Sequence, residues 1–158
     1  MLKIVSKELL NELSEKAVNS PRKRLNHNFH DDLADPINRM LNAFESGTYI
    51  QPHKHENPGK REIFIVLRGS LVVVFFDNSG TPIDFILLDP KKENFAVEIP
   101  VGAWHSLFAL ESGTVVYEVK DGPYFPISDK NFASWAPKEG DINTEEYLKT
   151  LTDQYYNR

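Results

Sequence analysis

Three of the five histidines and one glutamate stand in a pattern that suits metal binding. His53 and His55 are two residues apart, so on a strand both rings point to the same face. Glu62 opens the next strongly β-like segment, and His105 follows the tight turn expected at Pro100-Val101-Gly102. Three imidazoles and a carboxylate are suited to a divalent cation such as Zn, Fe, Mn, Ni or Cu. A six-coordinate ion with four protein ligands keeps two open positions, as in catalytic sites.

Other residues are candidates for the pocket beside this ion. Tyr49 and Gln51 share the parity of His53, which predicts that they line the cavity. Strand parity also turns Arg68 and Glu118 inward, although a buried ion pair or strand-end exposure explains each equally well. His30 is a candidate for the pocket entrance, as a base or a hydrogen-bond partner of the ligand.

Two polar features near the N-terminus could belong to the pocket, but a purely structural or surface role also explains each of them. His27, in the run Asn26 to His30, fits a capping or turn role at least as well as a role in the pocket. The basic cluster Arg22-Lys23-Arg24 has the chemistry to bind a phosphate or a sugar nucleotide. A solvated surface cluster is the commoner arrangement, and we favour it.

The elements that position these residues are mostly strands. Ser6–Ala17 reads as an amphipathic helix capped by Ser6, and Thr144–Tyr156 as a second helix with an Asn143…Glu146 capping pattern. Asp35–Phe44 fits either a helix or a strand, and the aromatic, Pro-rich segment after Lys120 is expected to pack as a loop onto the barrel. Strands are expected at 62–68, 70–77, 83–88, 95–99, 106–110 and 114–120, a spacing typical of a β-barrel or β-sandwich.

Length and composition restrict the class of protein. The 158 residues fit one domain, with a barrel core at about 38–120, an N-terminal helical segment at 1–37 and a C-terminal loop and helix at 121–158. The absence of cysteine excludes disulfides and thiolate metal sites. A net charge of −5 argues against nucleic-acid binding. The longest apolar run, Leu71 to Phe76, is too short to span a bilayer, and no signal-peptide core precedes it, so we expect a cytoplasmic protein without a membrane partner.

Two segments resemble the motifs of the cupin superfamily. Gly47-x5-His53-x-His55-x6-Glu62-x6-Gly69 is similar to the first cupin motif, and Pro100-x-Gly102-x2-His105 to the second. The gap between His55 and Glu62 is longer than usual, and Asn94 and Ala109 stand where the second motif has its leading glycine and trailing asparagine. All four ligand positions are intact. The resemblance implies an all-β double-stranded β-helix, the cupin or jelly-roll barrel, that binds one divalent ion.

Beyond the motifs, the chain resembles the WbuC-type cupin-fold metalloproteins, small bacterial proteins often associated with surface-polysaccharide gene sets. The resemblance covers roughly residues 2–140 and leaves the last helix as an extension. It implies the fold and the metal, and it does not imply a substrate. The similar stretches are Ser20 to Arg22, Asn26 to His30, Leu41 to Ala43, Ile99 to Ser106, and Glu118 through Pro137.

Three functions are compatible with these features. The leading hypothesis is a metal-dependent enzyme, of an isomerase or epimerase kind, acting on a small polar metabolite such as a sugar in polysaccharide metabolism. The alternatives are an Fe(II)-dependent dioxygenase and a non-catalytic protein that binds a small ligand through its metal. Apolar residues on both faces of 62–68, such as Ile63 opposite Phe64, need cover from the terminal segments or from a second subunit, so a homodimer is also expected.

Overall fold

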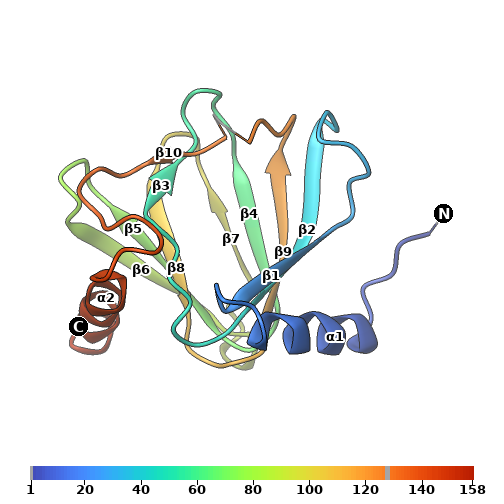
Figure 1. Ribbon diagram of the computed structural model, residues 1–158, viewed down its shortest axis with the longest axis horizontal. Coiled ribbons are helices and arrows are strands. Elements are labelled where there is room, and N and C mark those ends of the chain that lie inside the picture. The colour runs from blue at the N-terminus through green and yellow to red at the C-terminus, as the bar shows by residue number, and fades with distance from the viewer. Residues whose placement is uncertain (1, 127–128) are drawn as a thin grey trace.

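The described residues form two facing antiparallel sheets of five strands each, with a helix on the outer side of each sheet (Figure 1). The computed structural model describes residues 2–126 and 129–158. In one sheet the order is β1 (Arg24–Asn28), β2 (Ile37–Phe44), β9 (Thr114–Asp121), β4 (Glu62–Arg68) and β7 (Ala96–Ile99). In the other it is β10 (Asn131–Phe132), β3 (His53–Lys54), β8 (Trp104–Ala109), β5 (Leu71–Phe76) and β6 (Pro82–Leu88). The expected all-β barrel with helical ends is confirmed.

The apolar core lies between the two sheets. Every second residue of a strand points inward, so Phe64 and Val66 of β4 meet Leu71 and Val73 of β5 across the interior. Burial of these side chains supplies most of the free energy that holds the sheets together, at about 25 cal/mol per Å² of apolar surface. The other members of this cluster are Phe44, Leu88, Ile99, Leu107, Ala109 and Val116.

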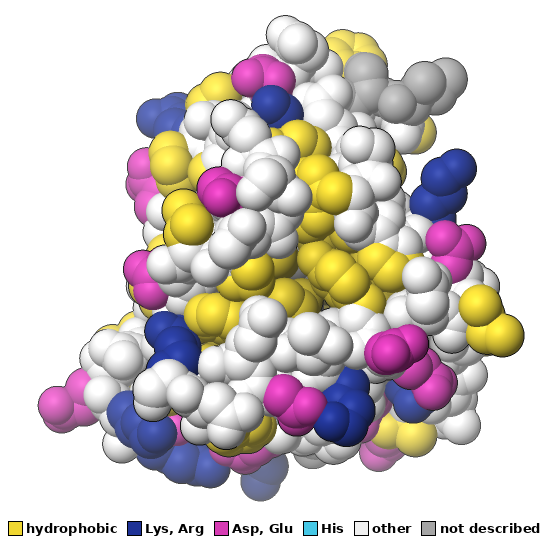
Figure 2. Space-filling model, turned by 90° about the vertical axis from the view of Figure 1, so that its left-hand side faces the viewer, with side chains coloured by type: hydrophobic (Ala, Val, Ile, Leu, Met, Phe, Trp, Pro, Cys, Tyr) yellow, Lys and Arg dark blue, Asp and Glu magenta, His cyan; other side chains and the backbone are white. Residues whose placement is uncertain are grey.

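Helix α2 (Thr144–Tyr156) explains why β5 is apolar on both faces. Val72, Val74 and Phe76 point away from the core and pack in a second cluster with Leu151 of the helix. Trp135, in the loop before the helix, packs on Phe76 with ring centroids 5.2 Å apart, which confirms that part of this aromatic segment covers the barrel. Figure 2 views the molecule from this side, where hydrophobic side chains gather across the middle of the face.

Helix α1 (Lys7–Val18) covers the outer face of the other sheet. The predicted cap is confirmed, since the Ser6 hydroxyl accepts a hydrogen bond from the Leu9 amide. Leu10 and Leu13 pack on Leu41 of β2. Asn143 is the N-cap residue of α2 as predicted, but its side chain makes no capping hydrogen bond.

The secondary structure of two segments near the N-terminus became clear only from the structure. The ambiguous stretch 35–44 contains strand β2, which pairs with β9 along its whole length. No strand was expected before residue 35, and His27 was given a capping or turn role, but Arg24–Asn28 is strand β1 and pairs with β2. Its inward positions are asparagines that face a cavity instead of the apolar core, so the usual alternation of apolar and polar residues is missing.

The homodimer stays a prediction. Helix α1 does not cover all of the outer sheet face: Ile63 and Ile65 of β4 are only half-buried, and Leu67 is exposed. In the part of the chain that the structure describes, no helix is long and apolar enough to cross a membrane.

A β-bulge turns the Arg68 side chain away from the inward direction that strand parity predicts. The register of β4 against β9 shifts between Val66 and Arg68, so the parity that turns Glu62 inward no longer applies to Arg68. Its guanidinium instead points to α1, where it donates to the Leu10 carbonyl at 2.9 Å and to the side chains of Asn11 at 2.8 Å and Ser14 at 2.5 Å. Arg68 therefore fastens the helix to the sheet and does not line the cavity.

This role predicts that Arg68→Ala destabilises the fold without affecting the site. The lost charge-assisted hydrogen bonds should cost about 1–3 kcal/mol of unfolding free energy. Urea denaturation measures this loss, and Arg61→Ala, which removes an exposed pair with Asp121, is the matched control with a smaller effect. Equal stability of the two variants, with ligand binding lost only in Arg68→Ala, contradicts the assignment.

Candidate metal centre and its cavity

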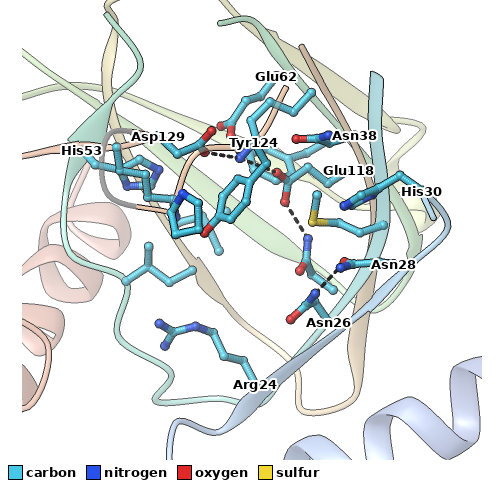
Figure 3. Close-up of a pocket in the computed structure, with 18 of the residues that line it drawn as sticks. Arg24, Asn26, Asn28, His30, Asn38, His53, Glu62, Glu118, Tyr124 and Asp129 are labelled. Atoms are coloured by element: carbon cyan, nitrogen blue, oxygen red, sulfur yellow. Dashed lines mark hydrogen bonds and ion pairs between the residues drawn. The ribbon is translucent and has the colours of Figure 1, made fainter. Parts of the chain in front are cut away.

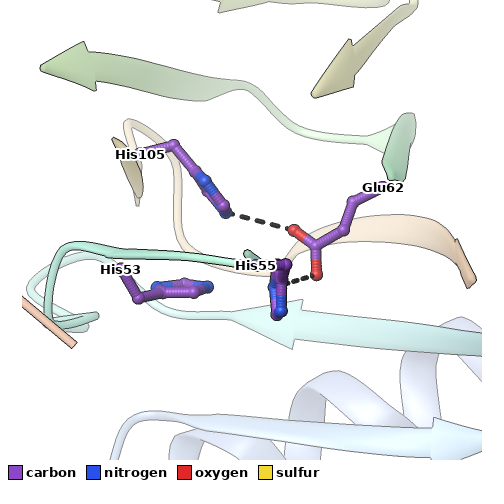
Figure 4. A group of neighbouring side chains, drawn as sticks. All are labelled: His53, His55, Glu62 and His105. Carbon is purple, nitrogen blue, oxygen red and sulfur yellow. Dashed lines mark ion pairs between the residues drawn. The ribbon is translucent and has the colours of Figure 1, made fainter. Parts of the chain in front are cut away.

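The four predicted ligands come together at one end of the barrel (Figure 4). His53 in β3 pairs directly with His105 in β8, and His55 follows β3 by one residue. Glu62 begins β4 in the opposite sheet, so the site joins the two sheets. One ligand atom from each residue lies within 4.8 Å of the others, and all four residues are at most 4% exposed. These four residues are called the metal centre below.

The imidazoles are oriented by backbone carbonyls. The Nδ1 atom of His53 contacts the Gln51 carbonyl at 3.0 Å, and that of His105 contacts the Ala103 carbonyl at 2.9 Å. The Nδ1 atom of His55 contacts the Asp129 carbonyl. A proton held on Nδ1 leaves Nε2 with a free lone pair, which is the form of histidine that binds metals.

The metal centre contains buried polar atoms that lack hydrogen-bond partners. They are the Nε2 atoms of His55 and His105 and the Oε2 atom of Glu62. The two nitrogens lie 2.8 and 3.1 Å from oxygens of the Glu62 carboxylate without forming a hydrogen bond of normal geometry. Leaving such atoms unpaired is costly, whereas one cation among them satisfies all three. The residues present therefore fit a divalent ion.

The charge states of the ligands also suit a cation. Burial lowers the pKa of His53 well below its usual value, so its imidazole is neutral near pH 7. Burial opposes ionisation of Glu62, but the contacts with His105 and His55 outweigh it, and the pKa of this carboxyl lies well below its usual range. Neutral imidazole and ionised carboxylate are the forms that coordinate metals.

A cavity of about 540 Å³ opens beside the metal centre (Figure 3). His53 and Glu62 line it, whereas His55 and His105 lie behind them, so an ion held by the four residues has its accessible side toward the cavity. The volume is in the range of roughly 300–1,000 Å³ usual for small-ligand sites. The wall formed by β1 and β2, called the amide wall below, carries four amide side chains beside Arg24, Met40 and Phe44: Asn26, Asn28, Asn38 and Asn42.

Two of the predicted pocket residues line this cavity. Glu118 of β9 accepts a hydrogen bond from the Asn42 amide at 2.6 Å. His30 follows β1, and its Nδ1 atom lies 3.1 Å from the Arg39 carbonyl oxygen and 3.2 Å from the Arg39 amide nitrogen, contacts that orient the ring. His27 is exposed, lies outside the lining, and packs edge-on against Phe29.

The prediction that Tyr49 and Gln51 line the cavity is wrong, because the structure places both residues outside it. The Tyr49 hydroxyl donates to the Pro137 carbonyl at 2.7 Å, and its ring packs edge-on against Tyr147. The Gln51 amide donates to the Ala133 carbonyl at 3.0 Å. Strand parity failed here because β3 is only two residues long, so residues 49–52 are not part of the strand that carries His53.

The basic cluster divides between the cavity and the surface. Arg22 and Arg24 both line the cavity and both pair with Glu139, at 2.5 and 2.7 Å. The preferred interpretation as a solvated surface cluster is therefore wrong for Arg24, whose side chain is only 14% exposed. Lys23 lies outside the cavity lining.

Sequence reasoning missed a buried charge network behind the metal centre. The Asp129 carboxylate accepts hydrogen bonds from Lys60 and, at 2.7 Å, from Lys120. Burial disfavours the charged form of Lys120, but Glu118, Glu62 and Asp129 outweigh it and raise its pKa. Strand parity could have indicated Lys120, because this residue shares a face of β9 with Glu118. Asp129 carried no such signal, because it lies in a loop.

The comparison of sequences places the chain in a family. The profile of the family described as "Domain of unknown function (DUF6016)" matches residues 5–88, which is more than half of the chain. The chain belongs to the DUF6016 family. No curated protein matches it in sequence.

Solved cupin structures share the fold of this DUF6016 protein. KdgF from Halomonas sp. is 21% identical, with a TM-score of 0.52 over 68% of this chain and 84% of that one. CapF from Staphylococcus aureus, described as a capsular polysaccharide assembling protein, is 23% identical, with a TM-score of 0.53 over 68% of this chain and 28% of that one. A cupin 2 domain-containing protein from Halorhodospira halophila is 18% identical, with a TM-score of 0.51 over 85% of this chain and 81% of that one. The DUF6016 chain therefore has the cupin fold.

The network around Asp129 predicts a double effect of Asp129→Ala. Removing the carboxylate leaves Lys60 and Lys120 buried without their partner, which should cost about 3–5 kcal/mol of unfolding free energy. The loosened Asp129 carbonyl should also weaken metal affinity by about 10–100-fold, because it orients His55. Denaturation and chelator competition measure the two effects, and Asp153→Ala, which breaks an exposed pair, should change neither. Unchanged metal affinity in a folded Asp129→Ala protein contradicts the positioning role.

Proposed function

We propose that the protein is a metal-dependent enzyme that isomerises or epimerises a small polar metabolite, a sugar or sugar derivative. The observation that carries the proposal is a buried set of three imidazoles and a carboxylate at the wall of an open cavity that also contains a carboxyl group outside the metal centre. His53, His55, Glu62 and His105 would hold one divalent ion, Zn, Fe, Mn or Ni. Such an ion, when bound, supplies a Lewis acid that polarises a carbonyl or binds neighbouring oxygens.

Glu118 is the residue proposed to move the proton. Isomerisation next to a carbonyl requires one group that removes a proton from carbon and returns it. Burial raises the pKa of Glu118, and the nearby charge of Glu62 adds to this effect. A carboxyl of raised pKa is more basic than an ordinary one once ionised and is therefore better suited to this exchange near neutral pH. The hydrogen bond from Asn42 fixes the direction of the carboxyl group.

His30 is the second group available for proton transfer. Its Nδ1 atom contacts the backbone of Arg39, so Nε2 is the nitrogen that faces no partner among the described residues and can contact a ligand. Lys120 lies 3.8 Å from Glu118 and 3.6 Å from Glu62, so its ammonium group balances the charge of both carboxylates. These residues bind and orient, and only Glu118 is assigned the transfer at carbon.

The resemblance to the WbuC-type metalloproteins supports a place in polysaccharide metabolism, and we propose a sugar as the substrate for that reason. The cavity volume of about 540 Å³ suits a monosaccharide derivative. The amide wall of β1 and β2 offers the donors and acceptors that sugar hydroxyls require.

The proposal predicts turnover that depends on Glu118. The metal-loaded protein should convert at least one member of a panel of sugars and sugar nucleotides, followed by NMR for loss or movement of a carbon-bound proton. Glu118→Gln keeps the size and the Asn42 contact but not the proton exchange, so the rate should fall by about 10²–10⁴-fold with unchanged metal content. Glu98→Gln, on an exposed position of β7, is the control and should keep full activity.

Three outcomes contradict the proposed enzyme. Full activity of Glu118→Gln removes its assigned role. Tight binding of a panel member without conversion indicates a non-catalytic ligand-binding protein. Substrate-dependent oxygen uptake by the iron-loaded protein indicates the dioxygenase.

A further inference from the structure

The cavity is richer in basic groups than the proposed reaction needs. Four basic side chains line it, against three carboxylates. The carboxylates already have partners: Asp129 binds Lys60 and Lys120, Glu118 binds Asn42, and Glu62 belongs to the metal centre. A divalent ion on the metal centre adds further positive charge. With Lys60 and Glu139, which pair with residues of the lining, five basic side chains meet four carboxylates, so one positive charge is left without a carboxylate.

Lys130 is the lining residue that carries this surplus charge. Its half-buried side chain lines the same cavity as His53. Within residues 2–126 and 129–158, no hydrogen bond or ion pair joins its ammonium group to another residue. Burial lowers the pKa of Lys130, whereas the charges of Glu62 and Glu118 partly oppose that effect. An ammonium group in this position gains from an anionic partner that enters from the cavity.

The basic groups at the other end of the cavity are held differently. Arg24 donates to the Tyr49 carbonyl at 2.8 Å and to Glu139 at 2.7 Å, and Arg22 shares the same carboxylate. Glu139 therefore already neutralises one of the two arginines and fixes both in place. Lys130 is free of such a partner among the described residues, so it is the group best placed to bind an anion from the ligand.

The amide wall adds a second kind of recognition. The side-chain amide of Asn26 donates to the side-chain oxygen of Asn28 at 2.7 Å, which leaves the Asn26 oxygen and the Asn28 amide without protein partners in the described part of the chain. The Asn38 side-chain oxygen is buried and unpaired. Unsatisfied amides side by side bind hydroxyl groups, which both donate and accept.

We propose that the cavity binds a polyhydroxylated anion, a sugar or polyol with one carboxylate or phosphate group, whose charge pairs with Lys130 and whose hydroxyl groups face the asparagines of β1 and β2. This inference rests on the proposed function for the location of the ligand, next to the metal centre. It deepens that function by naming the class of substrate. The binding step involves no covalent change.

The test is equilibrium binding to the metal-loaded protein, measured by calorimetry. The probes are glucose, galactose and mannose, each compared with its uronic acid and its 6-phosphate. At least one acid or phosphate should bind about 10-fold or more tightly than its neutral parent, the size expected of one charge-assisted hydrogen bond. Which of the two anions shows the preference distinguishes a carboxylate from a phosphate ligand.

Substitution of Lys130 makes the test specific. Lys130→Met should abolish the preference for the anion, leave the affinity for the neutral sugar unchanged, and keep the metal content, whereas Lys130→Arg should retain part of the preference. Lys138→Met, at an exposed position of the same segment, is the matched control and should behave like the natural protein.

The outcomes separate this inference from the proposed reaction. An anion preference that depends on Lys130, without any turnover, supports the inference and contradicts the enzyme. Turnover of neutral sugars with no preference for anions supports the enzyme and overturns the inference. Failure of every acid and phosphate to bind, or a preference that survives in Lys130→Met, also overturns it.

Discussion

The burial of unpaired ligand atoms at one end of the barrel is the constraint on which the rest of the structure depends. Nitrogens of His55 and His105 and an oxygen of Glu62 are removed from water with no hydrogen-bond partner. In an apolar interior each such atom costs free energy, and a cation is the one partner that satisfies them together. The other nitrogen of each imidazole is already used by a backbone carbonyl, so the rings cannot turn away to relieve the cost. The four residues could therefore bind one metal ion.

The surrounding elements hold these atoms in place. The pairing of β3 with β8 sets His53 beside His105, and the apolar core below keeps β4, which carries Glu62, opposite them. The loop that contains Asp129 supplies the carbonyl that orients His55, and Lys60 and Lys120 bind the carboxylate of the same residue. Asp129 compensates the charge of these buried lysines, together with Glu62 and Glu118 in the case of Lys120. The cavity, the charge network around Asp129 and the metal centre are therefore linked by these contacts.

The metal centre could be predicted from the sequence because its spacing is local and regular: two histidines on one face, a carboxylate at a strand start and a histidine after a tight turn. The pocket was harder to predict. Glu118 follows strand parity and lines the cavity, whereas a bulge turns Arg68 toward α1, and the shortness of β3 removes Tyr49 and Gln51 from its pattern. Strand β1 was missed because its inward residues are asparagines, which hide the alternation of apolar and polar residues. Asp129 was missed because it lies in a loop, where residues do not alternate between two faces. Parity is informative only where the strand is long and regular.

The most direct test of this account is the metal content per chain, measured by elemental mass spectrometry on the purified protein, on His105→Ala and on His27→Ala. Because His27 is exposed and outside the cavity, it controls for adventitious binding by surface imidazole. We predict about one divalent ion per chain in the natural protein and in His27→Ala, and its loss in His105→Ala. Equal metal content in both variants, or none in the natural protein after reconstitution, contradicts it.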